Sequence, residues 1–373
     1  MSILPRIPKV YFEFGAIASL YHGLEEFDIK RPLLVTDQGV VACGVFRQVL
    51  DADSRLGGFP VFDTVPENPT VEGVEKAFEL YKQEACDGVV AVGGGSVIDS
   101  SKAVAILAGH PGPISQFDKS PEKVTSATAP IIAVPTTAGT GSEVSLGAGI
   151  HPDASTASFS IGGEYIQPKL AICDPELTMT MPPLLTAGTG MDALSHCVEG
   201  YLSSSVNPIV DAVALDGIER VCKYIESAVK DGSDRSARWH MMMAALEGGI
   251  SILKGLGPDH AIGNTLGDRG LHHGVLVTVA LPSVLRFYES HVGDRMRSMA
   301  AAFGLGSAEE IGEAIKQLNK RVGLPTNLKE VGYTIDDMDR VAEICVDSFF
   351  NRTSPRVPTH DEYKTIIADA MGD

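Results

Sequence analysis

Positive charge is scarce in this sequence. Its 373 residues include 30 Lys and Arg against 48 Asp and Glu, which gives a formal net charge of -18 at pH 7. The basic residues form no cluster of the kind that follows a phosphate backbone, so nucleic acid and anionic membrane surfaces are poor candidate partners. We therefore expect the partner to be a small molecule.

Long apolar runs and paired cysteines are also missing. The N-terminal MSILPRIPKVYFEFG has no apolar stretch of signal-peptide length, and no run approaches the roughly twenty apolar residues of a membrane span. These absences favour a cytoplasmic protein with no membrane partner. The six cysteines are scattered without a Cys-x-x-Cys pair, which indicates reduced, structural thiols.

The residues that are present fall into two patterns along the chain. The length exceeds one ordinary core, and a hydrophobic fraction of 44% is typical of globular proteins, so we expect two domains. Short β-branched runs alternate with amphipathic helices in the first half, which is typical of a parallel sheet covered on both faces. Stretches of 3.6-residue period replace them after the MTMPP segment at Met179 to Pro183. The sequence therefore predicts an α/β domain over residues 1–180 and an all-helical domain over residues 181–373.

The individual elements follow from the same patterns. Strands are predicted at residues 33–35, 88–92, 131–134 and 170–172, each followed by a turn with Gly, Pro, Asp or Thr. Helices are predicted at residues 71–85, 97–107, 208–229, 236–253, 308–322 and 335–349, with a last helix capped at Thr359.

Two loops in the first half can bind a phosphorylated ligand. DGVVAVGGGSVIDSSKAVAIL is a strand, three glycines with Ser96, and a helix, which directs free backbone N–H groups at an anion. AVPTTAGTGSEV follows another strand and carries the hydroxyls of Thr136, Thr137, Thr140 and Ser142, which can bond phosphate, ribose or carboxamide. Ordinary tight or polar turns without a ligand are the alternative for both.

Asp37 ends the strand PLLVTD. An acidic residue in this place of a dinucleotide fold accepts hydrogen bonds from ribose hydroxyls and repels a 2′-phosphate, which favours NAD over NADP. Asp37 precedes the glycine loop, whereas the usual fingerprint has its acid about twenty residues after it, so we expect a different strand order. A solvated turn aspartate is the alternative.

A carboxylate and three imidazoles in the second half are a candidate metal site. Asp192 and His196 lie four residues apart in GTGMDALSHCVEGY and share one face of a predicted helix. His260 and His273 follow in the Gly-rich KGLGPDHAIGNTLGDRGLHHG. One oxygen and three nitrogens suit Fe²⁺, Zn²⁺ or a similar first-row ion, although a surface acid with a hydrogen-bonded His has the same spacing. The two candidate cofactor loops lie in the other predicted domain. We therefore expect the cofactor and the metal to bind in a cleft between the two domains.

Together these segments resemble the metal-dependent, iron-containing (group III) alcohol dehydrogenase family. The resemblance spans nearly the whole chain and rests on FEFGAIASL, ENPTVE, GGGSVIDSSKA, PTTAGTGSE, DPELT, GTGMDALSHCVEGY, GLGPDHAIGNTLG and HHGVLVTVALPSVLRF in this order. It implies the dehydroquinate synthase-like fold: an α/β NAD(P)-binding domain, a helical domain and a metal, Fe²⁺ or Zn²⁺. The implied metal ligands are Asp192, His196, His260 and His273. The implied cofactor residues are Asp37, Asn68, Gly94, Gly95, Ser96, Asp99, Thr136, Thr137 and Thr140.

This sequence departs from the family pattern at three places. Asn264 stands where relatives commonly have a second His near the substrate, so we expect the proton to pass through water, ribose hydroxyls or His272. The segment up to His273 is one residue short, and the following Gly274 favours His273 over His272 as the ligand. Ser158 replaces a Lys that often contacts the cofactor ribose.

The predicted function is a metal-dependent, NAD(P)-linked alcohol dehydrogenase or aldehyde (or ketone) reductase that uses NAD in preference to NADP, in a homodimer or higher homo-oligomer. Lys254, Arg269 and His272 flank the ligand motifs, which suggests a small, anionic alcohol or carbonyl substrate, with solvated loop cations as the alternative. A carbon–oxygen lyase or cyclase of the dehydroquinate synthase type and a non-catalytic NAD- or metal-binding relative are the competing functions.

Overall fold

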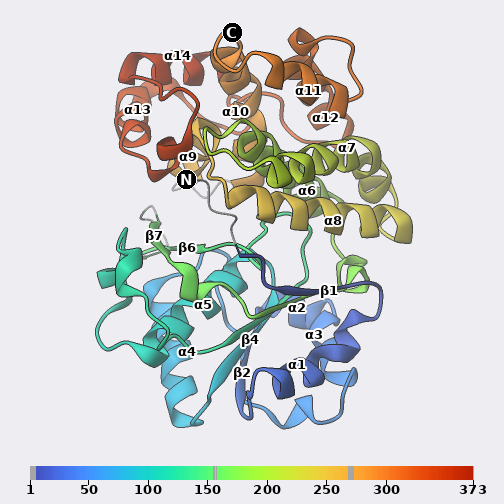
Figure 1. Ribbon diagram of the computed structural model, residues 1–373, viewed down its shortest axis with the longest axis vertical. Helices are drawn as coiled ribbons and strands as arrows, with labels where there is room; N and C mark the ends of the chain where they lie inside the picture. Colours follow the sequence, from blue (N-terminus) through green and yellow to red (C-terminus); the bar gives the residue numbers. More distant parts are fainter. Residues whose placement is uncertain (1–5, 154–155, 157, 268–272, 373) are drawn as a thin grey trace. The chain divides into compact units, whose positions relative to one another are not determined.

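The structure is a computed structural model that describes residues 6–153, 156, 158–267 and 273–372 (Figure 1). The chain divides into two compact units. The N-terminal unit comprises Arg6–Thr137 and Ser142–Thr180, and the C-terminal unit comprises Ala138–Gly141 and Met181–Asp373. The predicted combination of a parallel-sheet unit and an all-helical unit is confirmed.

A six-stranded sheet in the order β1-β8-β5-β4-β2-β3, with every pairing parallel, forms the centre of the N-terminal unit. The four predicted strands are present, each within one residue of its predicted ends, whereas β1, β3 and a separate antiparallel pair, β6 and β7, were not predicted. The strands are β1 (Lys9–Phe12), β2 (Pro32–Val35), β3 (Val61–Phe62), β4 (Gly88–Gly93), β5 (Ile131–Pro135), β6 (Gly147–Ile150), β7 (Phe159–Gly162) and β8 (Leu170–Cys173).

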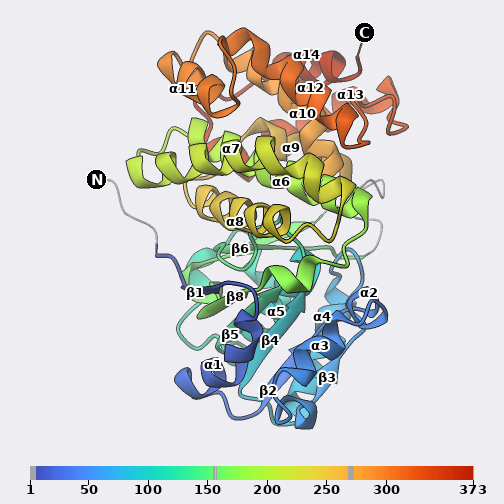
Figure 2. The ribbon, with the colours of Figure 1, turned by 90° about the vertical axis from the view of Figure 1, so that its right-hand side faces the viewer.

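Helices cover both faces of this sheet (Figure 2). Side chains of α1 (Leu20–Glu26) and α3 (Val45–Asp51) pack with alternate strand residues such as Val90 and Ile132, and those of α4 (Val71–Gln83) and α5 (Gly95–Gly109) pack with the other set. Strands β2, β4, β5 and β8 are therefore buried on both faces and consist almost wholly of apolar residues. The short α2 (Gln38–Ala42) follows β2.

The C-terminal unit contains only helices among its described residues. Helices α6, α7 and α8 lie side by side (Figure 1), and α6 is the most deeply buried of them because its glycines admit close neighbours: a Cβ added at Gly200 would lie 2.6 Å from the carbonyl oxygen of Ser251. The helices are α6 (Pro183–Leu202), α7 (Pro208–Lys230), α8 (Arg235–Ile252), α9 (Pro258–Leu266), α10 (His273–Tyr288), α11 (Asp294–Ala302), α12 (Ile311–Arg321), α13 (Met338–Val346) and α14 (His360–Ala370).

Two predicted helices differ from the observed ones near the C-terminus. The helix predicted at 308–322 begins with a separate 3₁₀ helix, Ala308–Glu310, and the one predicted at 335–349 contains only α13 as α-helix. The α-helix ends at Val346, and a 3₁₀ helix, Phe349–Thr353, begins after Ser348, whose side chain accepts a hydrogen bond from the backbone N–H of Phe350. The predicted cap at Thr359 is confirmed, with Glu362 completing a capping box.

No described helix is both long and apolar enough to cross a bilayer.

Candidate active site

Helix α6 presents Asp192 and His196 on one face. The two residues lie one turn apart in the buried middle of the helix and are 3% and 4% exposed. Their spacing brings His196 Nε2 to 3.6 Å from Asp192 Oδ1. The pair predicted from the i, i+4 spacing is therefore adjacent and oriented toward one point.

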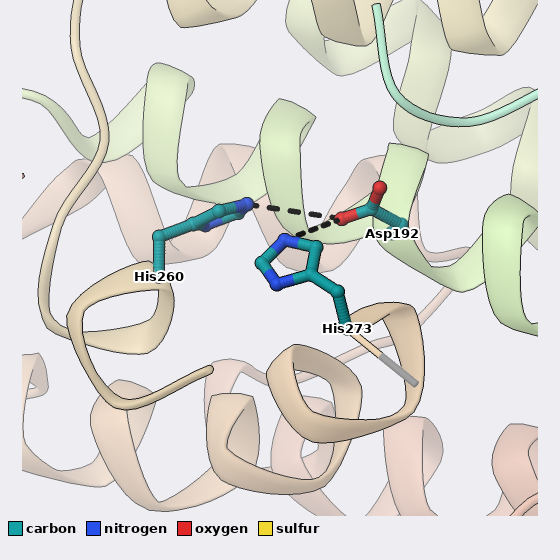
Figure 3. A group of neighbouring side chains, drawn as sticks. All are labelled: Asp192, His260 and His273. Atoms are coloured by element: carbon teal, nitrogen blue, oxygen red, sulfur yellow. Dashed lines mark ion pairs between the residues drawn. The ribbon is translucent and has the colours of Figure 1, made fainter. Parts of the chain in front are cut away.

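Two further helices bring imidazoles to the same oxygen. His260 lies in the first turn of α9, and its Nε2 is 3.8 Å from Asp192 Oδ1. His273 is the first residue of α10, and its Nε2 is 3.7 Å from the same atom (Figure 3). Three ring nitrogens from three helices thus surround one carboxylate oxygen, while His272 lies outside the described residues.

The chemistry of this group fits a metal ion. Among the described residues, Asp192 Oδ1 and His260 Nε2 are buried without a hydrogen-bond partner, which is costly unless something else pairs with them. Ligand atoms of Asp192, His260 and His273 all lie within 4.8 Å of one another. One carboxylate oxygen and three imidazole nitrogens are a suitable donor set for a first-row divalent cation.

The electrostatics of the group suit the same role. Burial opposes ionisation of Asp192, but the neighbouring imidazoles, led by His196, outweigh it and hold the pKa of this carboxyl below its usual range. Burial lowers the pKa of His196 to about 4, so its ring is neutral with a free lone pair. Burial also acts on His260, but the carboxylates of Asp192 and Glu199 outweigh it and raise the pKa of His260 to about 10. A metal ion at Nε2 would therefore take the place of the proton that the metal-free ring holds.

The far nitrogens of two imidazoles are held by groups that the sequence did not reveal. His196 Nδ1 lies 3.3 Å from the carbonyl oxygen of Gly139, and His260 Nδ1 lies 2.7 Å from Glu199 Oε2. Glu199 follows His196 by three residues on α6, so helical spacing in DALSHCVE was the available signal for it. Such second contacts orient a ligand ring and fix which nitrogen faces the metal.

The glycine loop and the first threonines of the second loop meet at one end of the sheet. Gly94 is the N-cap of α5 and has no side-chain cap, and Thr136 N donates to the carbonyl oxygen of Gly93 over 3.1 Å. A Cβ added at Gly94 would lie 3.3 Å from Thr137 Oγ1, a buried atom that has no hydrogen-bond partner in the part of the chain that the structure describes. Gly94, Gly95 and Thr137 thus form a close cradle that fits the phosphates of a dinucleotide.

The other predicted cofactor residues have varied surroundings. Asp37 follows β2, the neighbour of β4, and caps α2 by accepting from Val40 N over 2.9 Å. Asp99 accepts from Ser142 Oγ and Gly149 N over 2.6 and 2.9 Å, so internal hydrogen bonds occupy both of its oxygens. Ser96 donates to the carbonyl oxygen of Glu67, Asn68 lies in an exposed bend, and Thr140 belongs to the C-terminal unit.

The structure corrects the role suggested for Lys254. This side chain is buried, and its Nζ donates to the carbonyl oxygen of Tyr201 and to Asp211. Arg295 binds the same carboxylate over 2.9 Å. Lys254 therefore serves an internal ion pair and is not a contact for a substrate anion, while Arg269 and His272 lie outside the described residues.

Sequence comparison places both halves of the chain in one family. Residues 8–175 match the family model for iron-containing alcohol dehydrogenase, and residues 186–371 match the C-terminal model of the Fe-containing alcohol dehydrogenase family. The chain belongs to the iron-containing alcohol dehydrogenase family. As a member it is a metal-dependent oxidoreductase acting on CH–OH donors, which confirms the predicted fold and reaction class over the lyase alternative.

Individual relatives of this alcohol dehydrogenase act on various small alcohols and aldehydes. A 4-hydroxybutyrate dehydrogenase of Cupriavidus necator is 41% identical, with all of both chains covered. A structure of 1,3-propanediol oxidoreductase has a TM-score of 0.94 at 32% identity, covering 99% of this chain and 100% of the other. A sulfoacetaldehyde reductase from Bifidobacterium kashiwanohense, solved with NAD⁺, has a TM-score of 0.92 at 29% identity, covering 100% and 99%.

Proposed function

We propose that this chain is an NAD-dependent dehydrogenase of a short hydroxy acid, which in reverse reduces the corresponding aldehyde acid. The observation that carries the catalytic part is the convergence of three imidazole Nε2 atoms on one buried carboxylate oxygen. The anionic substrate is supported by two relatives whose names contain 4-hydroxybutyrate and sulfoacetaldehyde.

In this proposal Asp192, His196, His260 and His273 hold one divalent ion, Fe²⁺ or Zn²⁺. When bound, the ion polarises the substrate oxygen and the nicotinamide exchanges the hydride. Asp192 contributes the only negative charge among the four ligands, so the site keeps a net positive charge toward a developing alkoxide. The buried position of α6 fixes two ligands rigidly, which limits reorganisation during the reaction.

The N-terminal unit binds NAD in this proposal. The N–H groups at the start of α5, at Gly94 and Gly95, bind the pyrophosphate, because a helix N-terminus favours negative charge. Thr137 donates its hydroxyl to the cofactor, and the remaining predicted residues of this unit, Asn68, Ser96, Asp99 and Thr136, belong to the same site. Thr140 stays a predicted cofactor residue. Asp37 accepts from the ribose hydroxyls and so selects NAD over NADP.

Proton exchange in this proposal does not use a side chain at position 264. Asn264 lies in α9 one turn beyond His260, and an amide does not titrate near neutral pH. The proton therefore passes through water, the ribose hydroxyls or His272. We further propose domain limits of 1–180 for NAD binding and 181–373 for metal binding, a homodimer or higher homo-oligomer, and a cytoplasmic location.

A matched substrate pair tests the substrate proposal. We expect kcat/KM for 4-hydroxybutyrate with NAD⁺ to exceed that for 1-butanol by about tenfold or more, since one favourable charged contact of about 1.4 kcal/mol gives that factor. The assay follows NADH formation, with NADP⁺ as the control for cofactor choice. A clear preference for the plain alcohol would contradict the anionic substrate and leave the dehydrogenase assignment intact.

A further inference from the structure

Glu199 is a buried carboxylate next to the proposed metal ligands that is not itself one of the four. We infer that Glu199 is a positioning residue, which holds the imidazole of His260 in the tautomer and orientation that metal binding requires. The inference rests on the proposed metal-binding function. Glu199 is 3% exposed and lies on the face of α6 that also carries His196.

Both carboxylate oxygens of Glu199 accept hydrogen bonds from residues of α9. Oε2 accepts from His260 Nδ1 over 2.7 Å and from the backbone N–H of His260 over 3.3 Å. Oε1 accepts from the backbone N–H of Asp259 over 2.9 Å. One side chain of α6 therefore binds the first turn of α9 and the ring of its ligand at once.

The start of α9 has no cap of its own. Its N-cap is Gly257, which has no side chain, and its first residue is Pro258, which has no N–H group. Asp259 and His260 thus supply the first free N–H groups of the helix, and Glu199 satisfies both. A carboxylate in this place is also favoured by the positive end of the helix dipole. Glu199 therefore performs for α9 the function that an N-cap side chain usually performs.

The same carboxylate sets the chemical state of the ligand. In the neutral, metal-binding ring, a hydrogen bond from Nδ1–H to Glu199 leaves the lone pair on Nε2, the atom that faces Asp192 Oδ1 at 3.8 Å. It also makes Nε2 more basic and prevents rotation of the ring. Without this bond, the neutral ring could carry its proton on either nitrogen.

The surroundings of the carboxylate are closely packed. A Cβ added at Gly257 would lie 2.7 Å from Glu199 Oε1, so the glycine is needed for this close approach. At the next position along α6, Gly200, the backbone packs directly against α8. The carboxylate is therefore fixed between α6 and α9.

The substitution Glu199→Gln tests the inference because it keeps the size of the side chain. The amide can accept from only one of the two backbone N–H groups at once, and it lacks the charge that favours Nδ1–H. We expect the affinity for Zn²⁺ and Co²⁺, measured on the metal-free protein by competition with a chelator, to fall by about 10–100-fold. The visible absorption bands of the Co²⁺ protein should shift as well.

Glu247→Gln is the matched control. Glu247 is also a largely buried glutamate of the C-terminal unit. Its carboxylate, however, lies 3.3 Å from Nε of Arg220, a residue of α7. We expect this variant to bind metal within about twofold of the wild type. An equal loss in both variants, or wild-type affinity and spectrum in Glu199→Gln, would overturn the positioning role.

The experiment separates this inference from the proposed function. A wild-type protein that binds no metal refutes the function itself, whereas metal binding that Glu199→Gln leaves unchanged refutes only the role of Glu199. If Glu199→Gln does not fold, NMR of the ¹⁵N-histidine wild-type protein with Zn²⁺ gives the answer. We expect a His260 Nδ1 proton with cross-peaks to the amide protons of Asp259 and His260, and an Nε2-protonated His260 would overturn the inference.

Discussion

At the scale of single residues, the site depends on one oxygen atom. Asp192 Oδ1 has three imidazole nitrogens within 3.8 Å and, among the described residues, no hydrogen-bond partner of its own. Such an arrangement is unfavourable in a protein interior unless a positive charge, a metal ion or a protonated imidazole, lies beside the carboxylate. The metal assignment therefore depends chiefly on this oxygen and the three nitrogens around it.

Asn264 allows a test of proton exchange. The substitution Asn264→His places a titratable ring one turn beyond His260, so we expect the pH profile of kcat to gain an ionisation near about 6.5. Steady-state rates of NADH formation from pH 5.5 to 9.5 measure it. Asn264→Gln, which does not titrate, should keep the wild-type profile. A profile that is the same in all three proteins would count against any relay role for position 264.

The sequence predicted some site residues better than others. The spacing of Asp192 and His196 identified a shared helix face without any structure. His260 and His273 were grouped with them by residue type and by family resemblance, because no local spacing relates α9 and α10 to α6. Glu199 was not singled out, since a glutamate on a helix is ordinarily solvated. Lys254 was misassigned because its partner Asp211 lies 43 residues away in the sequence.

At the scale of elements, strand prediction succeeded where burial is complete. Strands β2, β4, β5 and β8 lie between two layers of helices and consist almost entirely of apolar residues, which made them visible in the sequence. The edge strand β1 is partly exposed, β3 has two residues, and the β6–β7 pair begins and ends in glycine. Their pairing is decided by tertiary contacts that local sequence does not encode.

The close contact between Gly257 and Glu199 at the start of α9 affects stability. We expect Gly257→Ala to lower the free energy of unfolding by about 1–3 kcal/mol, because the new methyl group would lie 2.7 Å from Glu199 Oε1. Urea denaturation of the metal-free proteins measures this change.

Gly267→Ala is the control for this prediction. It lies at the other end of α9, where an added Cβ meets no described residue within 4 Å, so the free energy of unfolding should change by less than about 0.5 kcal/mol. Equal effects of the two substitutions would contradict the tight contact at Gly257.

At the scale of the whole molecule, the change of sequence pattern near residue 180 reflects two kinds of core. The N-terminal unit buries the two faces of one sheet, so its strands are apolar without periodicity. The C-terminal unit packs helices against helices, so its sequence shows the 3.6-residue period. The pattern predicted both architectures but could not show that Ala138–Gly141 belongs to the C-terminal unit, where Gly139 contacts His196.

Removal and return of the metal in wild type and Asp192→Asn shows whether catalysis depends on an ion held at Asp192. The measurement is NADH formation from NAD⁺ and a mixed alcohol panel, with bound metal determined on the same samples. We predict that chelation abolishes wild-type activity, that Fe²⁺ or Zn²⁺ restores it, and that Asp192→Asn stays lower in kcat/KM by about a thousandfold or more, since several kcal/mol of charge stabilisation are lost. Full activity of the metal-free wild type, or restoration of Asp192→Asn to the wild-type rate, would contradict the account.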